Sequence, residues 1–240
     1  MSDLMIILLP GLDGTGLLFG PFLELLPPYL NVLTIPYPSH LLMNYSELKN
    51  YVIERIPANK SFVLLAESFA GPLALEIAAA KAEFVQALVL VATFVENPLS
   101  YLGKWTRHLA WIPLFKFPMP RNLIRRYLLG KDASGDQVEH VLHALRMVKP
   151  KVFNYRVHLV LHTNAKEALC KCSMPILYLF GAKDKLVTKR SLDVILSLRS
   201  DIECILFDAP HLILQKDPVM AREIIDSFLR KHEYGLGKSK

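Results

Sequence analysis

The sequence predicts an α/β fold built on a parallel β-sheet with helices on both faces. Short apolar segments, rich in residues that favour β-strands, alternate with segments of helical periodicity. This is the pattern of a parallel sheet covered on both sides. These apolar segments are continuous, as is expected of strands that are buried on both faces. A length of 240 residues suits one such domain with a smaller insertion. The hydrophobic share of 52% favours a large core.

Six strands are predicted from the apolar segments. Each has a length typical of a buried strand, and most are separated by a segment that can form a crossover helix. The strands are expected at Leu4–Leu9, Val32–Ile35, Phe62–Leu65, Ala87–Ala92, Ile176–Phe180 and Ile202–Phe207.

Four helices are predicted around this sheet. The first begins at Asn44, because Glu47 three residues later completes a capping-box pattern, and it ends before Pro57. The last begins at Asp217, which precedes a proline at the first helical position. The four helices are expected at 44–56, 69–82, 188–198 and 217–232.

The connection between the fourth and fifth strands is too long for a simple crossover. It holds about 80 residues, several times the usual length. It begins with an aromatic-rich stretch at 98–120, and two helices are predicted after it, at Arg121–Leu129 and Asp136–Met147. We interpret residues 97–172 as a helical cap subdomain inserted into a core that is formed by residues 1–96 and 173–240.

Positive charge is concentrated in this insertion. The chain has a formal net charge of +6, but residues 97–172 hold 13 Lys or Arg against four Asp or Glu, and the remainder holds 15 against 18. One hypothesis is that the basic cap binds an anionic partner, such as an acidic acyl carrier or a membrane surface. Arg121, Arg125 and Arg126 are the leading candidates, since the first two lie four residues apart on a helix. A solvated cationic face is the alternative, and no nucleic acid is expected as a partner.

A candidate nucleophile lies at a predicted strand-to-helix turn. Residues 65–71 read Leu-Ala-Glu-Ser-Phe-Ala-Gly, so that Ser68 follows a strand and precedes a helix. A sharp turn of this kind holds a serine hydroxyl out above the sheet, and it requires small neighbours two residues away on either side. Ala66 and Ala70 meet that requirement. Glu67 is interpreted as a charge that is paired near the end of the sheet.

A nucleophilic serine needs a base, and the base needs an acid that orients it. Asp184 follows the fifth predicted strand and His211 follows the sixth, so both lie at the sheet edge where open α/β sheets assemble their sites. Two other carboxylates compete with Asp184 for this role. Glu96 follows the fourth strand, and Asp208 lies three residues before His211.

These motifs resemble those of the α/β-hydrolase superfamily. The superfamily's elbow is usually Gly-x-Ser-x-Gly, and here Ala66 and Ala70 replace both glycines. The order of nucleophile, acid and base along the chain is also that of the superfamily. The resemblance implies a catalytic triad of Ser68, Asp184 and His211. It also implies six mainly parallel strands in the order second, first, third, fourth, fifth, sixth, with an inserted helical cap.

The loop after the first strand is a candidate oxyanion loop. Residues 10–16 read Pro-Gly-Leu-Asp-Gly-Thr-Gly, which lacks the Gly-Lys-Ser/Thr end of a phosphate-binding loop. Carried over by position, the resemblance implies an oxyanion hole made by the backbone N–H groups of Leu12 and Phe69. Pro10 replaces the histidine that is common here in the superfamily. His40, in the loop after the second strand, is interpreted as structural.

The resemblance implies serine-dependent hydrolysis of carboxylic esters through an acyl-enzyme intermediate. A carboxylesterase of this kind acts on a small-molecule or acyl ester and needs no metal or organic cofactor. The same triad also serves acyltransferases and thioesterases that act on acyl-carrier or lipid substrates. The loop at 10–16 also resembles hydrolase regions of plant-type ester-forming acyltransferases. A non-catalytic binding module on a hydrolase fold is a hypothesis of a different class.

The sequence favours a cytoplasmic protein. Its three cysteines, Cys170, Cys172 and Cys204, cannot all pair and are expected to be free thiols. No apolar segment reaches the roughly 18 residues that a transmembrane helix needs. The first ten residues lack the basic region of a signal peptide.

Overall fold

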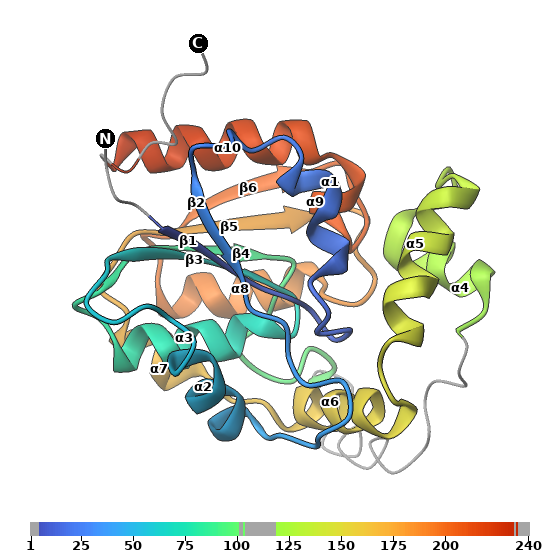
Figure 1. Cartoon of the computed structure of the whole chain (residues 1–240), viewed down its shortest axis with the longest axis horizontal. Helices are drawn as coiled ribbons and strands as arrows, with labels where there is room; N and C mark the ends of the chain where they lie inside the picture. Colours follow the sequence, from blue (N-terminus) through green and yellow to red (C-terminus); the bar gives the residue numbers. More distant parts are fainter. Residues whose placement is uncertain (1–4, 101–102, 104–118, 233, 235–240) are drawn as a thin grey trace.

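The computed structural model describes residues 5–100, 103, 119–232 and 234. A six-stranded sheet forms its centre (Figure 1). Every neighbouring pair of strands is parallel, and the order is β2-β1-β3-β4-β5-β6. The predicted sheet and its strand order are confirmed. The strands are β1 (Met5–Leu9), β2 (Asn31–Thr34), β3 (Phe62–Glu67), β4 (Val85–Val91), β5 (Ile176–Gly181) and β6 (Glu203–Phe207).

Helices cover both faces of the sheet, as the continuous apolar strands predict. One hydrophobic cluster joins Ile7 and Leu64 to α2, α3, α7 and α8. A second joins their neighbours Ile6 and Val63 to α1, α9 and α10 on the opposite face (Figure 1). Successive strand residues therefore enter different cores. The helices are α1 (Gly20–Leu23), α2 (Tyr45–Ile53), α3 (Ala70–Ala80), α7 (Lys166–Lys171), α8 (Lys189–Leu198), α9 (Ile213–Lys216) and α10 (Pro218–Lys231).

Side-chain caps fix several of the helix starts. Asn44 accepts a hydrogen bond from the N–H of Glu47 at 3.0 Å, and the Glu47 carboxylate accepts one from the N–H of Asn44 at 2.7 Å. This is the capping box that the sequence predicts for α2. The Asp217 side chain caps α10 in a similar way. A second capping box, formed by Ser134 and Gln137, opens a helix of the insertion.

The insertion between β4 and β5 is helical throughout residues 121–171, apart from its turns. Both predicted helices are present, the first as a short α-helix that continues into a π-helical turn. Two further helices, α6 and α7, were not predicted. The β-branched and aromatic residues of α6 have low helix propensity, and α7 is only six residues long. Most of the aromatic-rich stretch lies outside the described residues. The helices before α7 are α4 (Arg121–Ile124), η4 (Arg125–Leu129), α5 (Gly135–Arg146) and α6 (Pro150–His162).

The insertion carries a hydrophobic cluster of its own. This third cluster contains Ile124 from α4, Val138 and Leu142 from α5, and Phe153 from α6. It also includes Leu212, which is in the loop after β6. The insertion is therefore packed against the sheet edge at which the strands end. Within the described part of the chain, no helix is both long enough and apolar enough to cross a bilayer.

Candidate active site

Ser68 occupies a strained turn between β3 and α3. Its φ of 52° lies in the left-handed region that non-glycine residues seldom adopt. Three hydrogen bonds hold this conformation. The Ser68 N–H donates to the Val91 carbonyl at 2.8 Å, and the Ser68 carbonyl accepts from the Thr93 hydroxyl at 2.5 Å and from the Gly71 N–H at 3.0 Å. The turn is therefore fixed by β4 and the loop after it.

Small residues allow the chain to make this turn. Ala66 and Ala70 are both fully buried, in agreement with the steric argument from the sequence. Gly71 is tighter still, because a Cβ atom there would lie 1.9 Å from the Thr93 Oγ1. The elbow therefore requires a glycine at position 71, directly after Ala70.

The structure brings Ser68, His211 and Asp184 together in one hydrogen-bonded chain. The Ser68 hydroxyl lies 2.9 Å from Nε2 of His211, and Nδ1 of His211 lies 2.7 Å from Oδ2 of Asp184. The other oxygen of Asp184 accepts the N–H groups of Leu186 at 2.8 Å and Val187 at 3.0 Å. All three side chains of the chain are buried. A carboxylate held in this way orients the imidazole so that Nε2 can accept the serine proton.

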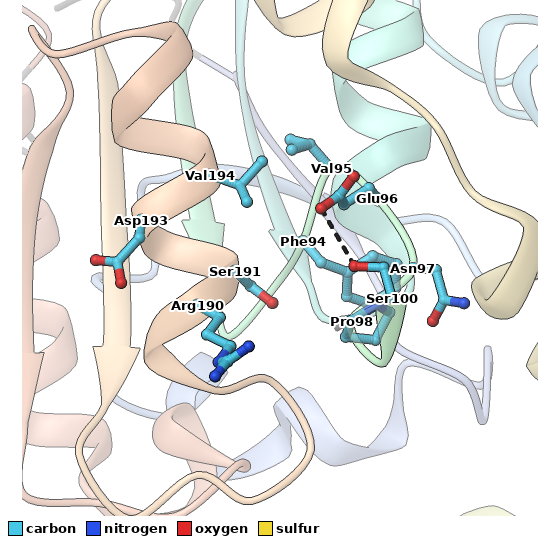
Figure 2. A pocket seen from close by; sticks show the side chains of 10 residues that line it. All are labelled: Phe94, Val95, Glu96, Asn97, Pro98, Ser100, Arg190, Ser191, Asp193 and Val194. Carbon is cyan, nitrogen blue, oxygen red and sulfur yellow. Dashed lines mark hydrogen bonds between the residues drawn. The ribbon is translucent and has the colours of Figure 1, made fainter. Parts of the chain in front are cut away.

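Glu96 lies in a different cavity from His211 (Figure 2). This cavity of about 310 Å³ separates the loop after β4 from α8. There, one oxygen of Glu96 accepts from the Ser100 hydroxyl at 3.3 Å, and the other pairs with Lys166 at 2.6 Å. Glu96 is therefore engaged elsewhere and is not the carboxylate that contacts His211.

Two other residues weighed from the sequence also lie away from the site. The exposed Asp208 carboxylate pairs with Lys183 at 2.8 Å. His40 is exposed, and it is not among the described residues that line the cavity at Ser68. Of the candidate acids, only Asp184 contacts the imidazole.

The loop at 10–16 lies against the elbow. A Cβ atom built on Gly11 would lie 3.8 Å from the Cβ of Ser68. Leu12 lines the same cavity as Ser68, and the Phe69 carbonyl accepts a hydrogen bond from the Tyr45 hydroxyl at 3.0 Å. No hydrogen bond joins the N–H of Leu12 or Phe69 to an acceptor within the described residues. This arrangement is compatible with the predicted oxyanion hole, which stays a prediction.

Arg156 of α6 supports this loop, and sequence reasoning missed it. Its guanidinium is buried and donates to the carbonyls of Leu12 at 2.9 Å, Asp13 at 2.8 Å and Pro38 at 3.1 Å. A Cβ atom on Gly14 would lie 2.3 Å from this group. Burial lowers the pKa of Arg156, which the nearby Tyr37 and Asp13 partly oppose. The only sequence signal is one arginine within an apolar stretch of α6.

We expect Arg156→Met to lower kcat for the ester hydrolysis that the resemblance implies by about 100-fold, because small displacements of catalytic groups have effects of that size. The substitution leaves three carbonyls without their donor, so the loop bearing Leu12 should move. Arg146→Met is the matched control, because Arg146 is an exposed arginine on the same insertion. Steady-state kinetics on both folded variants checks this. A kcat within threefold of wild type for Arg156→Met would contradict it.

Ser68 and His211 line an apolar cavity of about 260 Å³. Its lining residues with polar side chains are Asp13, Glu67, Ser68, Tyr127 and His211. The insertion supplies much of the remaining wall. The cavity-lining residues from α4, η4, α5 and α6 are Leu123, Tyr127, Leu128, Val141, Leu145 and Phe153. A cavity with few polar groups beside the Ser68 hydroxyl suits a ligand with an apolar chain.

Glu67 differs from the interpretation based on sequence. It is 2% exposed, and it has no ion pair with Lys, Arg or His in the part of the chain that the structure describes. The interpretation of Glu67 as a paired charge is therefore wrong. Oε2 accepts a hydrogen bond from the Gln215 amide at 3.3 Å. Burial raises the pKa of Glu67 to about 7, although His211 opposes that shift.

The pH dependence of activity should report the ionisation of His211. Burial disfavours the imidazolium, but the Asp184 carboxylate favours it through charge and hydrogen bonding, so the pKa of His211 is raised above its usual 6.5. Because His211 must be neutral to accept a proton, kcat/KM should rise with pH through a midpoint above 6.5. A pH–rate profile with chemistry rate-limiting checks this. A flat profile from pH 5 to 9 would be inconsistent with His211 as the base.

The arginines proposed from the sequence do not form one free patch. Arg121 pairs with Glu139, and the Arg125 side chain donates to the Ala133 carbonyl at 3.4 Å.

The three cysteines are free thiols, as predicted. Among the described residues, no group of three or more His, Cys, Asp or Glu side chains is placed to hold a metal ion.

Comparison with solved structures identifies the fold. A thermophilic esterase from Thermogutta terrifontis superposes with a TM-score of 0.80 at 15% identity, over 96% of this chain and 91% of that chain. A lipase-esterase related protein from Clostridium acetobutylicum gives 0.76 at 15% identity, over 95% of each chain. An enol-lactonase from Burkholderia xenovorans gives 0.72 at 14% identity, over 96% of this chain and 92% of that chain. No protein-family model and no curated protein matches the sequence.

The chain therefore has the α/β-hydrolase fold, and the resemblance drawn from its motifs is confirmed at the level of the fold. At these identities the comparison does not extend to the substrate.

Proposed function

We propose that the protein is a carboxylesterase that hydrolyses carboxylic esters through an acyl-enzyme intermediate on Ser68. The observation that carries this proposal is the buried hydrogen-bonded chain from Ser68 through His211 to Asp184, which faces an apolar cavity. The fold supports it, because solved proteins with this fold include esterases.

Acylation begins when His211 accepts the Ser68 proton through Nε2, at a separation of 2.9 Å. The Ser68 oxygen attacks the ester carbonyl, and the carbonyl oxygen becomes negatively charged. The N–H groups of Leu12 and Phe69 stabilise this oxyanion, and each such donor is worth roughly 3–4 kcal/mol. Asp184 stabilises the imidazolium. His211 then gives its proton to the departing alcohol, and the acyl group remains on Ser68.

Deacylation repeats these steps with water as the nucleophile. His211 takes a proton from water, the hydroxide attacks the acyl carbonyl, and the bond to Ser68 breaks. The proton returns to the Ser68 oxygen and the acid is released. No group other than the triad and the oxyanion donors is required.

A panel of p-nitrophenyl esters of rising acyl length tests the proposal, with a thioester and a peptide as controls. The apolar lining of the cavity predicts that kcat/KM rises with chain length until the cavity of about 260 Å³ is filled. Absence of turnover for all esters would reject a carboxylesterase.

The proposed architecture assigns residues 1–96 and 173–240 to the hydrolase core and residues 97–172 to the cap. The separate hydrophobic cluster of α4, η4, α5 and α6 supports this division for most of the insertion, while α7 packs in the cluster of the core. So does the cavity, because the core supplies Ser68 and His211 and the insertion supplies most of the apolar wall.

A second candidate function is thioester hydrolysis or acyl transfer with an anionic acyl carrier, and a lysine-rich cleft favours it. The cleft has a volume of about 620 Å³ and lies beside the loops that carry Asp184 and His211. Two of its lysines are paired with carboxylates. Arg126, Lys131 and Lys185 make no ion pair within the described residues. The charged lining residues are Arg126, Lys131, Asp132, Lys183, Lys185, Asp208 and Lys216, with a net charge of +3.

Reversing two of these charges separates the candidates. The double variant Arg126→Glu, Lys131→Glu removes positive charge from the cleft without changing the loops that carry the triad. For a carrier-specific enzyme, kcat/KM for butanoyl-coenzyme A should fall at least tenfold, and that for p-nitrophenyl butanoate should stay within twofold. Equal effects on both substrates would reject the carrier hypothesis.

A further inference from the structure

Glu67 is the one lining residue of the catalytic cavity, among those described, whose carboxylate has an unbonded oxygen buried there. It is the last residue of β3 and directly precedes Ser68. Its side chain is 2% exposed and lines the cavity together with Ser68 and His211. Oε1 has no hydrogen-bond partner in the protein.

The position of the Glu67 carboxyl group is fixed from one side. Gln215 of α9 donates from Nε2 to Glu67 Oε2 at 3.3 Å, and the same nitrogen donates to the Leu18 carbonyl at 3.1 Å. Gln215 is itself buried, so it holds Oε2 in a fixed position. The second oxygen is left for another group.

The surroundings of Glu67 make an unbonded oxygen costly. The cavity lining includes Leu12, Leu18 and Leu212, which cannot donate a hydrogen bond, and the lining side chains that can donate, Ser68, Tyr127 and His211, make none to Oε1. An unsatisfied polar group in such surroundings is strongly disfavoured. A ligand that brings a donor to this point therefore gains a hydrogen bond that the empty protein lacks.

We infer that Glu67 is a specificity-determining residue, whose Oε1 binds a hydroxyl group on the acyl part of the substrate, close to the scissile carbonyl. This inference rests on the proposed ester hydrolysis and names its substrate class as hydroxyacyl esters. The alcohol must leave before water attacks the acyl carbonyl, so the acyl group is expected to occupy the enclosed end of the cavity. We therefore assign the hydroxyl to the acyl part of the substrate.

A hydroxyl suits this carboxyl group better than a cation does. Burial raises the pKa of Glu67 to about 7, so both the neutral and the charged forms are present near neutral pH. A hydroxyl can donate to the carboxylate and can accept from the carboxylic acid. An ammonium group can only donate.

The test compares methyl butanoate with its 2-hydroxy and 3-hydroxy derivatives in wild type, Glu67→Met and Glu67→Gln. The quantity measured is the ratio of kcat/KM for a hydroxy ester to that for the plain ester. For at least one hydroxy ester this ratio should fall at least tenfold in Glu67→Met, since loss of a substrate hydrogen bond has effects of that order. Glu67→Gln should keep most of the wild-type ratio, because an amide can also form a hydrogen bond with a hydroxyl.

The ratio does not depend on the fraction of active enzyme, and comparison between variants cancels the intrinsic reactivity of each ester. Glu83→Met, at an exposed position, is the matched control and should leave the ratio unchanged. An unchanged ratio in Glu67→Met for both hydroxy esters would overturn the inference, while continued turnover would leave the proposed esterase activity intact.

A second measurement avoids the Glu67 variants. Binding of 2- and 3-hydroxybutanoate to the Ser68→Ala protein should be at least tenfold tighter than binding of butanoate for the favoured isomer. Equal affinities for all three acids would overturn the inference. A preference for one hydroxy acid would show that the cavity binds a hydroxyl even if no ester is turned over, whereas the absence of turnover would count against the proposed function.

Discussion

Replacing Ser68 with alanine should lower kcat for ester hydrolysis by roughly 10⁴-fold or more. The substitution removes the only atom that forms the covalent intermediate. Alanine keeps the Cβ atom, and the hydrogen bonds that fix the turn involve the backbone of residue 68 and not its hydroxyl. We therefore expect the elbow to remain folded. The residual rate should come from the oxyanion donors and from substrate binding alone.

Purity and folding decide how this experiment is interpreted. Thermal unfolding of Ser68→Ala should match that of wild type to within a few degrees, because the substitution deletes one hydroxyl. If purified Ser68→Ala retains a tenth of wild-type turnover, another residue is the nucleophile.

Replacing Asp184 with asparagine should lower kcat by about 10⁴-fold, as the same change does in a serine protease triad. Asp184 contacts Nδ1 of His211 at 2.7 Å. An asparagine amide in that position can donate to Nδ1 and so stabilise the tautomer with its proton on Nε2. In that tautomer Nε2 cannot accept the proton of Ser68. Asparagine can still accept the N–H groups of Leu186 and Val187 through its oxygen, so the loop should keep its shape.

The competing carboxylates supply the controls for this prediction. Glu96→Gln and Asp208→Asn should each reduce kcat by less than threefold, because one residue pairs with Lys166 and the other with Lys183. If kcat of Asp184→Asn stays within tenfold of wild type while Glu96→Gln is nearly inactive, the acid of the triad is the residue after the fourth strand, Glu96.

Much of the fold follows from local patterns in the sequence. Strands buried on both faces are continuous apolar segments, and the parallel order follows from the resemblance to the α/β-hydrolase superfamily. Caps at Asn44 and Asp217 set helix starts because they act within one turn. The helix α6 was missed because its residues have low helix propensity, and packing against the insertion's own cluster stabilises it.

The triad residues could be proposed from sequence because each follows a strand, and the ends of parallel strands meet at one edge. The residues that support the triad could not be proposed from the sequence. Arg156 contacts the loop at Leu12 across 144 positions of sequence, and no local pattern encodes such a contact. The burial of Glu67 was also missed, because it depends on elements distant in the sequence, such as Gln215 of α9, and their placement is a tertiary property.

Labelling with a fluorophosphonate tests the central claim most directly, which is that His211 and Asp184 activate Ser68 as a nucleophile. Intact-mass measurement should show one phosphonyl group per chain, and peptide mapping should place it on Ser68. Ser68→Ala should not be labelled, and Asp184→Asn should react at least 100-fold more slowly than wild type. Absence of labelling in the folded wild-type protein, or a label on another residue, would contradict the account.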